Sequence, residues 1–234
     1  MTSERKILSV DIVTLFPEML AGFFEVGVLK AARVAGLIQI RLHNLRDFTD
    51  DAHHQVDDRP YGGGPGMVLK VEPLHRAVEA IRQPQARTQV LLTSAQGQRF
   101  DQASAKALSG YDQLIVLCGR YEGVDERTLS FVDRELSIGD YVLCGGDLAA
   151  AVISEAVCRL VPGVVGDAES VSTDSFYEAP LLGVPQYTRP PVFNGLAVPE
   201  VLLSGNHEQV ATWRREQALK KTLQNRPELL RRNG

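Results

Sequence analysis

Segments with strand character alternate with segments of helical character from Lys6 to about Leu160. Ile7–Leu15 is rich in β-branched residues, and Phe16-Pro17-Glu18 after it is typical of a helix start with proline in the first turn. This alternation predicts an α/β fold, in which helices cover both faces of a mostly parallel sheet.

The other elements of this part follow from the same periodicity. We expect strands at Leu37–Leu42, Val90–Thr93, Leu114–Cys118 and Tyr141–Leu143, and helices at Val26–Ala35, Glu72–Arg82, Asp101–Leu108 and Asp147–Leu160. Gly36 and Pro162-Gly163 stand where two of these helices should end.

The character of the chain changes after residue 166. Asp167–Ser175 is polar and acidic, and Pro180–Pro199 is proline-rich, which predicts a linker and then an irregular segment. Asn206 and Gln209 form an N-cap pair ahead of a last helix over Val210–Leu223. We therefore expect a first domain at 1–165, a flexible linker at 166–178 and a small helical C-terminal domain at 179–234.

Charge is unevenly distributed along the chain. The net charge is −4, but residues 205–234 hold seven Lys or Arg against three Glu, so this end carries +4 and the rest −8. A mildly acidic body with a basic end fits a specific anionic partner met at that end. A solvated basic helix face would give the same pattern.

Several classes of protein are excluded by what the sequence lacks. No apolar stretch approaches the roughly 20 residues that span a bilayer, and no signal peptide precedes the first strand, so we expect a cytoplasmic protein without membrane contact. The three cysteines have no Cys-x-x-Cys spacing, which argues against a disulfide framework or zinc site. His53 and His54 lie among aspartates, but adjacent loop histidines are usually solvated, and we assign no metal site.

Three glycine-containing loops each follow an expected strand: Ser94–Gly97, Gly119–Gly123 and the stretch from Ile138 to Gly146. In an α/β sheet such loops meet at the ligand crevice, and glycine lets the backbone approach a ligand closely. One such loop alone would be an ordinary turn, but three in succession favour a composite small-molecule site. The dinucleotide, P-loop, nucleophile-elbow and zinc-protease motifs are all absent.

The segment Arg59–Met67 holds four glycines and two prolines in nine residues. It is too poor in side chains to pack a core, so a lid, a base-binding loop and a mobile linker all fit it.

Three further side chains have structural alternatives to a functional role. Arg159 could serve only the dipole of the helix it ends, Asp174 could be a turn or cap residue, and Trp213 fits a packing anchor better than a base-stacking platform.

Five segments, in order, resemble the bacterial tRNA (guanine-N1)-methyltransferases of the SPOUT superfamily. They are Tyr61–Met67, Cys118–Gly123 with Asp125–Arg127, Ser137–Leu143, Pro185–Pro190 and Val201–His207. The resemblance extends from about Lys6 to Leu230. It implies an α/β fold with a deep trefoil knot and a homodimer whose active site combines the knot of one subunit with the C-terminal domain of the other.

The resemblance also implies a cofactor, S-adenosylmethionine, held by the glycine loops inside the knot. Glu122 would face the methionine amino group. By motif position the cofactor-binding residues would be Leu92, Thr93, Ser94, Gly119, Tyr121, Glu122, Ile138, Gly139, Asp140, Tyr141, Val142, Leu143, Gly145 and Gly146. Magnesium is tied to the family's methyl transfer, and the sequence assigns no ligands to it.

The implied reaction methylates N1 of the guanosine immediately 3′ of the tRNA anticodon, typically when another guanosine precedes it. Guanine N1 must lose a proton before it attacks the methyl group, and Asp174 matches the family's general base. Arg159 matches the arginine that stabilises the guanine anion. The residues expected to meet tRNA are Gly62, Gly63, Arg189, Arg214, Arg215 and Lys220, with Lys221 beside them on the basic end.

This chain departs from the family at Gly183, where many relatives carry an acidic residue in a stretch shorter by one residue. It also stops soon after Pro227–Leu230, where some relatives have further helix. Two alternatives to the implied function are a SPOUT methyltransferase that acts on another RNA and a non-catalytic RNA-binding module. The residue types at positions 159 and 174 argue against the second.

Overall fold

A computed structural model of the chain describes residues 7–166 and 173–231. The chain divides into two compact units, Met1–Gly166 and Asp167–Gly234. Part of the linker expected at 166–178 falls on residues 167–172, outside the described residues.

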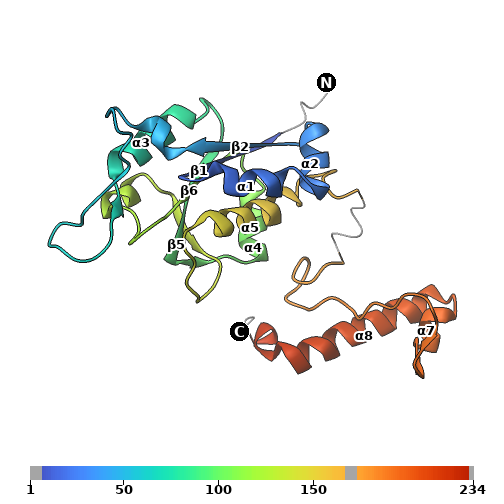
Figure 1. The fold of residues 1–234 in the computed structure, drawn as a ribbon. Coiled ribbons are helices and arrows are strands. Elements are labelled where there is room, and N and C mark those ends of the chain that lie inside the picture. The colour runs from blue at the N-terminus through green and yellow to red at the C-terminus, as the bar shows by residue number, and fades with distance from the viewer. Residues whose placement is uncertain (1–6, 167–172, 232–234) are drawn as a thin grey trace. The chain divides into compact units, whose positions relative to one another are not determined.

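The first unit is built on a five-stranded sheet whose order is β2-β1-β6-β5-β7 (Figure 1). Every pairing in it is parallel. The α/β class and the mostly parallel sheet are therefore confirmed. The strands are β1 (Leu8–Thr14), β2 (Ile38–Asn44), β5 (Thr88–Arg99), β6 (Gln113–Cys118) and β7 (Arg134–Ser137).

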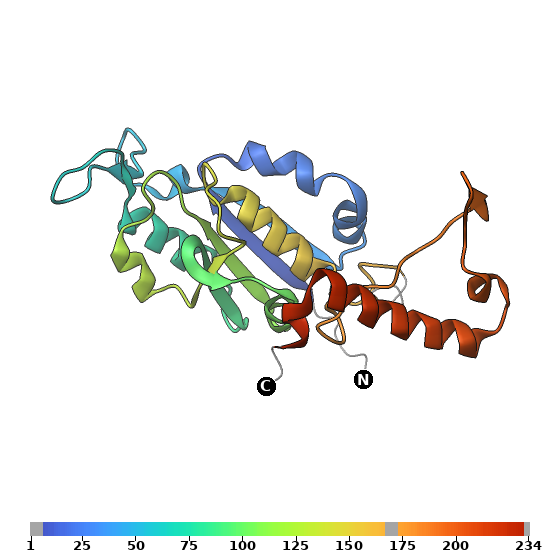
Figure 2. The ribbon, with the colours of Figure 1, turned by 90° about the horizontal axis from the view of Figure 1, so that it is seen from below.

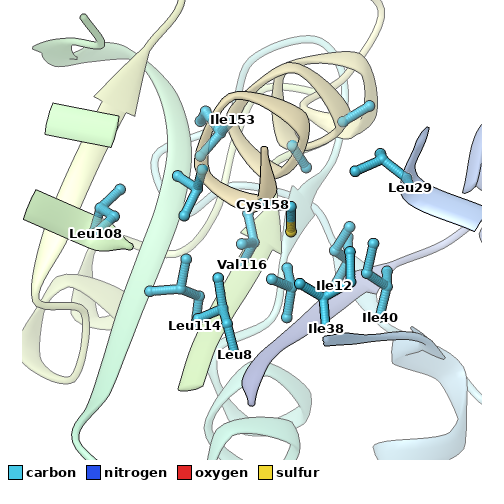
Figure 3. Close-up of a cluster of buried hydrophobic side chains, with 14 of the residues drawn as sticks. Leu8, Ile12, Leu29, Ile38, Ile40, Leu108, Leu114, Val116, Ile153 and Cys158 are labelled. Atoms are coloured by element: carbon cyan, nitrogen blue, oxygen red, sulfur yellow. The ribbon is translucent and has the colours of Figure 1, made fainter. Parts of the chain in front are cut away.

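Helices cover both faces of this sheet because alternate strand residues point to opposite sides. Leu114 and Val116 of β6 belong to one buried cluster, and Ile115 and Leu117 belong to the other. The first cluster packs under α1 (Pro17–Phe24), α2 (Gly27–Val34), α4 (Gln102–Leu108) and α5 (Asp147–Cys158), and the second under α3 (Val71–Ile81) and the 3₁₀ turns η1 (Leu45–Phe48) and η2 (Glu126–Ser130). Figure 2 shows α5 lying over one face of the sheet. Figure 3 shows Ile153 and Cys158 of that helix above Val116.

The helix boundaries expected from the sequence are confirmed to within a few residues. Pro17 is the first residue of α1, and Gly36 follows α2 with φ of 67°. Asp101 caps α4, since its carboxylate accepts a hydrogen bond from the Ser104 N–H at 2.9 Å. These local signals suit the backbone at a helix end: proline has no N–H to leave unpaired, glycine adopts the positive φ, and aspartate supplies an acceptor.

The expected strand at Tyr141–Leu143 is wrong. These residues form a loop, and the side chains of Tyr141 and Val142 are 58% and 98% exposed. The fifth strand is instead β7, a short segment with two charged residues in four. Strand β5 also runs past the expected Val90–Thr93. Thr93 and Gln98 both pair with Leu136, so the loop expected at 94–97 is a bulge inside the strand.

A buried aspartate stands in the middle of β1. Asp11 is 0% exposed and accepts hydrogen bonds from Arg41 Nε at 2.6 Å and from Gln113 Nε2 at 2.8 Å, with His43 Nε2 also at 2.8 Å. Burial alone would raise the pKa of this carboxyl. The hydrogen bonds from Arg41, His43 and Gln113 outweigh burial and hold the pKa at about 2. Asp11 is therefore an ionised, fully partnered group under the second face of the sheet.

The second unit is dominated by α8 (His207–Asn225). Asn206 caps this helix as expected, because its side chain accepts a hydrogen bond from the Gln209 N–H at 3.2 Å. Before it come α7 (Glu200–Leu203) and a small hairpin of β8 (Val192–Phe193) and β9 (Leu196–Ala197), and the 3₁₀ turn η3 (Pro227–Leu230) follows it. Within the described residues, no helix is both long enough and apolar enough to span a membrane.

Candidate active site

The bulge in β5 and the loops after β6 and β7 surround one cavity of ≈ 440 Å³. Parallel strands bring their carboxyl ends to one edge of the sheet, so loops distant in sequence meet there. Thirteen of the fourteen residues expected to bind the cofactor line this cavity: Leu92, Thr93, Ser94, Gly119, Tyr121, Glu122, Ile138, Gly139, Tyr141, Val142, Leu143, Gly145 and Gly146. Asp140, the fourteenth, is exposed and lies outside the lining.

The loops after β6 and β7 are packed backbone to backbone. The Gly146 N–H donates a hydrogen bond to Gly119 O at 2.8 Å. A Cβ at Gly146 would lie 1.8 Å from Thr93 Oγ1, so a side chain at this position would push the loop away from β5. Glycine is required here for close approach rather than for an unusual backbone conformation.

A buried ion pair joins the same two loops. Arg120 Nη2 lies 2.7 Å from Asp147 Oδ2, and their side chains are 13% and 1% exposed. Arg120 also donates to Cys144 O at 3.3 Å, and its guanidinium lies 4.6 Å from the centre of the Phe16 ring. The Thr14 hydroxyl donates to the other carboxylate oxygen of Asp147. The pair therefore ties the loop after β6 to the loop before α5.

The sequence prediction did not include Arg120, Ser137 or Cys144, which also line the cavity. The available signal was their position, because every residue in a loop at the carboxyl end of a parallel strand is a candidate for the site. Cys144 is exposed, whereas Cys118 and Cys158 are buried. Burial raises the pKa of the Cys118 thiol well above its usual range and that of Cys158 to about 12.

The glycine-rich segment 59–67 is attached beside the cavity at its C-terminal end. The Glu122 N–H donates to Met67 O at 3.0 Å, and a Cβ at Gly66 would lie 2.5 Å from Glu122 Oε1. Gly62 and Gly63 are exposed and have φ of 85° and 80°, a conformation that favours glycine. This segment thus presents bare backbone next to the carboxylate that lines the cavity.

The two expected catalytic residues lie in different units. Arg159 is the residue after α5 in the first unit, and it is half-buried. Asp174 is exposed in the second unit, in a loop that precedes the β8–β9 hairpin.

The basic residues of the second unit lie mainly on α8. Arg214 and Arg215 line a groove of ≈ 480 Å³ with His207. Arg189 and Lys220 are exposed. Lys221 instead donates a hydrogen bond to Gly183 O at 3.2 Å.

Trp213 is half-buried, with its ring centre 6.4 Å from that of Tyr187, which fits a packing role. Over residues 7–166 and 173–231, no group of three or more His, Cys, Asp or Glu side chains is placed to hold a metal ion.

A parallel α/β sheet with glycine loops around a cavity at its carboxyl edge is the arrangement typical of α/β proteins that bind small molecules. Comparison with known proteins identifies the family. The family model described as tRNA (Guanine-1)-methyltransferase TrmD matches residues 8–232. The chain belongs to the tRNA (guanine-N1)-methyltransferase family.

Individual relatives named tRNA (guanine-N(1)-)-methyltransferase cover nearly the whole chain. The protein from Dictyoglomus turgidum is 53% identical over 228 residues, which are 97% of this chain and 92% of the relative. The one from Geotalea uraniireducens is 53% identical over 94% of this chain and 89% of its own length. The Moorella thermoacetica protein is 53% identical over 96% and 91%.

Proposed function

We propose that this methyltransferase transfers the methyl group of S-adenosylmethionine to N1 of the guanosine immediately 3′ of the tRNA anticodon. The observation that carries the proposal is the cavity at the carboxyl edge of the sheet, lined by the loops that the family resemblance assigns to the cofactor. Family membership over residues 8–232 supplies the reaction class.

The residues around the cavity fit S-adenosylmethionine. A volume of ≈ 440 Å³ lies in the range of small-molecule sites, and the glycines of the lining have no side chain that would hold a nucleoside away from the backbone. Tyr121 and Tyr141 offer aromatic faces, and the Glu122 carboxylate can pair with the amino group of the methionine portion. When bound, the cofactor supplies a methyl group activated by its attachment to a sulfonium.

Asp174 would accept the proton of guanine N1, which frees the nitrogen lone pair for attack. Transfer forms the bond between N1 and the methyl carbon and breaks the bond between that carbon and sulfur, which keeps the electron pair. Arg159 would stabilise the negative charge that deprotonation leaves on the guanine. No side-chain nucleophile is needed, because the nucleophile belongs to the RNA.

The tRNA would be held by exposed basic residues and by the glycine-rich segment. Arg189, Arg214, Arg215 and Lys220 are exposed cations that can meet backbone phosphates. Gly62 and Gly63 would let the RNA approach the backbone closely, since a Cβ at either position would have nothing within 4 Å. In this assignment 1–165 is the cofactor domain, 166–178 the linker and 179–234 the tRNA-binding domain.

We also propose the trefoil knot and the homodimer. The match to the family model over residues 8–232 supports the knot, which the family resemblance implies. Leu148 and Val152, one turn apart on α5, are 54% and 47% exposed and offer an apolar stripe to a second copy. Sedimentation at micromolar concentration tests the dimer. Magnesium use and a cytoplasmic location stay predictions.

The catalytic assignment is tested with Asp174→Ala and Asp174→Asn. Both variants should bind S-adenosylmethionine as the wild type does, because Asp174 is not among the cavity-lining residues, and both should lose methyl transfer. Arg159→Lys serves as the companion variant and should keep part of the activity, since it keeps the charge. Normal turnover by Asp174→Ala would remove Asp174 as the base.

A further inference from the structure

The loop that carries Asp174, residues 173–183, is closed by hydrogen bonds within itself. The Phe176 N–H donates to Leu181 O at 2.9 Å, and the Gly183 N–H donates to Ser175 Oγ at 2.7 Å. Since Ser175 directly follows Asp174, the backbone that carries the carboxylate is tied to the far arm of the loop.

Gly183 makes this closure possible. A Cβ at Gly183 would lie 3.2 Å from Ser175 Oγ, which is tighter than ordinary van der Waals contact. The glycine therefore leaves room for the serine hydroxyl to approach its amide.

The far arm of the loop is also fixed to α8. The Leu182 N–H donates to Thr222 Oγ1 at 2.9 Å, and the Thr222 hydroxyl in turn donates to Ala218 O at 2.7 Å. Thr222 is 0% exposed. A single buried hydroxyl thus accepts from the loop and donates to the helix, so both of its hydrogen-bonding roles are used.

The same helix carries Arg214 and Arg215, which line the basic groove. Arg215 and Thr222 are seven residues apart, which is about two helical turns, so they lie on nearly the same side of α8 and about 10 Å apart along its axis. Movement of α8 against an RNA backbone would therefore carry the anchor of the Asp174 loop with it.

We propose that Ser175 and Thr222 are positioning residues for methyl transfer. They hold the Asp174 loop closed and attached to α8, so the helix that contacts the RNA backbone also sets the place of the carboxylate. This inference rests on the proposed role of Asp174 as the base. A base must stand within hydrogen-bond reach of its proton, and a displacement of about 1 Å can cost ~100-fold in rate.

The test compares single-turnover methyl transfer by Thr222→Val, Thr222→Ser and Ser175→Ala with the wild type. Valine keeps the shape of threonine and leaves the Leu182 N–H without its acceptor. Thr222→Val and Ser175→Ala should each slow transfer by about tenfold or more. The affinities for S-adenosylmethionine and for tRNA should stay within about twofold of wild type. Thr222→Ser keeps the hydroxyl and should transfer methyl at about the wild-type rate.

Asn225→Ala is the matched control. It removes a side-chain hydrogen bond of 3.0 Å to Lys221 O at the same end of α8, a bond that lies within the helix. This variant should transfer methyl at the wild-type rate. If Thr222→Val does not fold, Ser175→Ala decides the question, because Ser175 lies in a loop and outside the buried core.

Wild-type rates in both Thr222→Val and Ser175→Ala, with Asp174→Ala inactive, would overturn the positioning role and leave Asp174 as the base. Retained activity in Asp174→Ala would instead overturn the base itself. A parallel loss of tRNA affinity and rate in Thr222→Val would assign Thr222 to the stability of α8 and would also overturn the proposal.

Discussion

Replacing Asp147 with asparagine removes the negative charge that pairs with the Arg120 guanidinium. The Arg120 side chain is only 13% exposed. The asparagine oxygen can still accept the hydrogen bond from Thr14, so the change acts mainly on the ion pair. Arg120 would then stay buried against the Phe16 ring with its charge uncompensated. The loops on either side of the cavity would lose their ion pair and keep the hydrogen bond between Gly146 and Gly119.

The expected cost follows from the burial of both partners. Removing one member of a buried ion pair costs about 3–5 kcal/mol, because the remaining charge cannot regain its hydration. For a protein of this size each kcal/mol lowers Tm by roughly 2–4 °C, so Asp147→Asn should unfold roughly 6–20 °C below wild type. The affinity for S-adenosylmethionine should fall about tenfold, or 1.4 kcal/mol. The reason is that a smaller fraction of the protein would hold the two loops in the arrangement that binds the cofactor.

Calorimetric unfolding and titration with S-adenosylmethionine measure the two effects separately. Asp11→Asn is the matched control, because Asp11 is an equally buried carboxylate with an arginine partner and does not line the cavity. It should lower Tm and leave cofactor affinity unchanged. Unfolding of Asp147→Asn within about 2 °C of wild type, or an equal loss of affinity in both variants, would show that the ion pair does not hold the two loops together.

The pKa of Asp11 is about 2 against an ordinary 3.8, so its ionised form adds about 2 kcal/mol of stability that is present above about pH 4 and lost as the pH falls toward 2. In urea unfolding the difference between wild type and Asp11→Asn should shrink over this range, and a constant difference would contradict the assignment. Gly146→Ala should abolish cofactor binding in a folded protein, because its Cβ would collide with Thr93 Oγ1; unchanged titration would count against the packing. Iodoacetamide should label Cys144 ahead of the two buried thiols, and S-adenosylmethionine should slow the labelling. If Cys144 is labelled at the same rate with and without the cofactor, the cofactor binds outside this cavity.

Much of the first unit can be predicted from the sequence because its signals are local. Pro17 and Asp101 mark helix starts through the backbone groups they satisfy or dispense with. Strand β6 is buried on both faces, and its continuous apolar run predicts this without reference to any other segment of the chain.

The errors have a common physical cause. Tyr141–Leu143 looks like a strand because apolar residues that line a cavity and apolar residues that fill a core have the same composition. β7 has only four residues, Arg-Glu-Leu-Ser, and is held in the sheet by its neighbour β5. Its identity as a strand depends on pairing across the fold, which local pattern does not contain.

The candidate site, too, could be predicted from the sequence only in part. Glycine loops after strands predict the cavity, since parallel strands gather their carboxyl ends. The Arg120–Asp147 pair could not be predicted, because the two residues are distant in sequence and only the close packing of their loops brings them together. The hydroxyl of Thr222 gives no sequence signal at all, since its role depends on which loop amide reaches it.

The most direct test of the account measures methyl transfer from labelled S-adenosylmethionine to two tRNA transcripts that differ at one position. One carries guanosine immediately 3′ of the anticodon, and the other carries adenosine there. We expect label in N1-methylguanosine at that position in the first transcript and none in the second. Equal labelling of both transcripts, or methylation at a different atom or site, would contradict it.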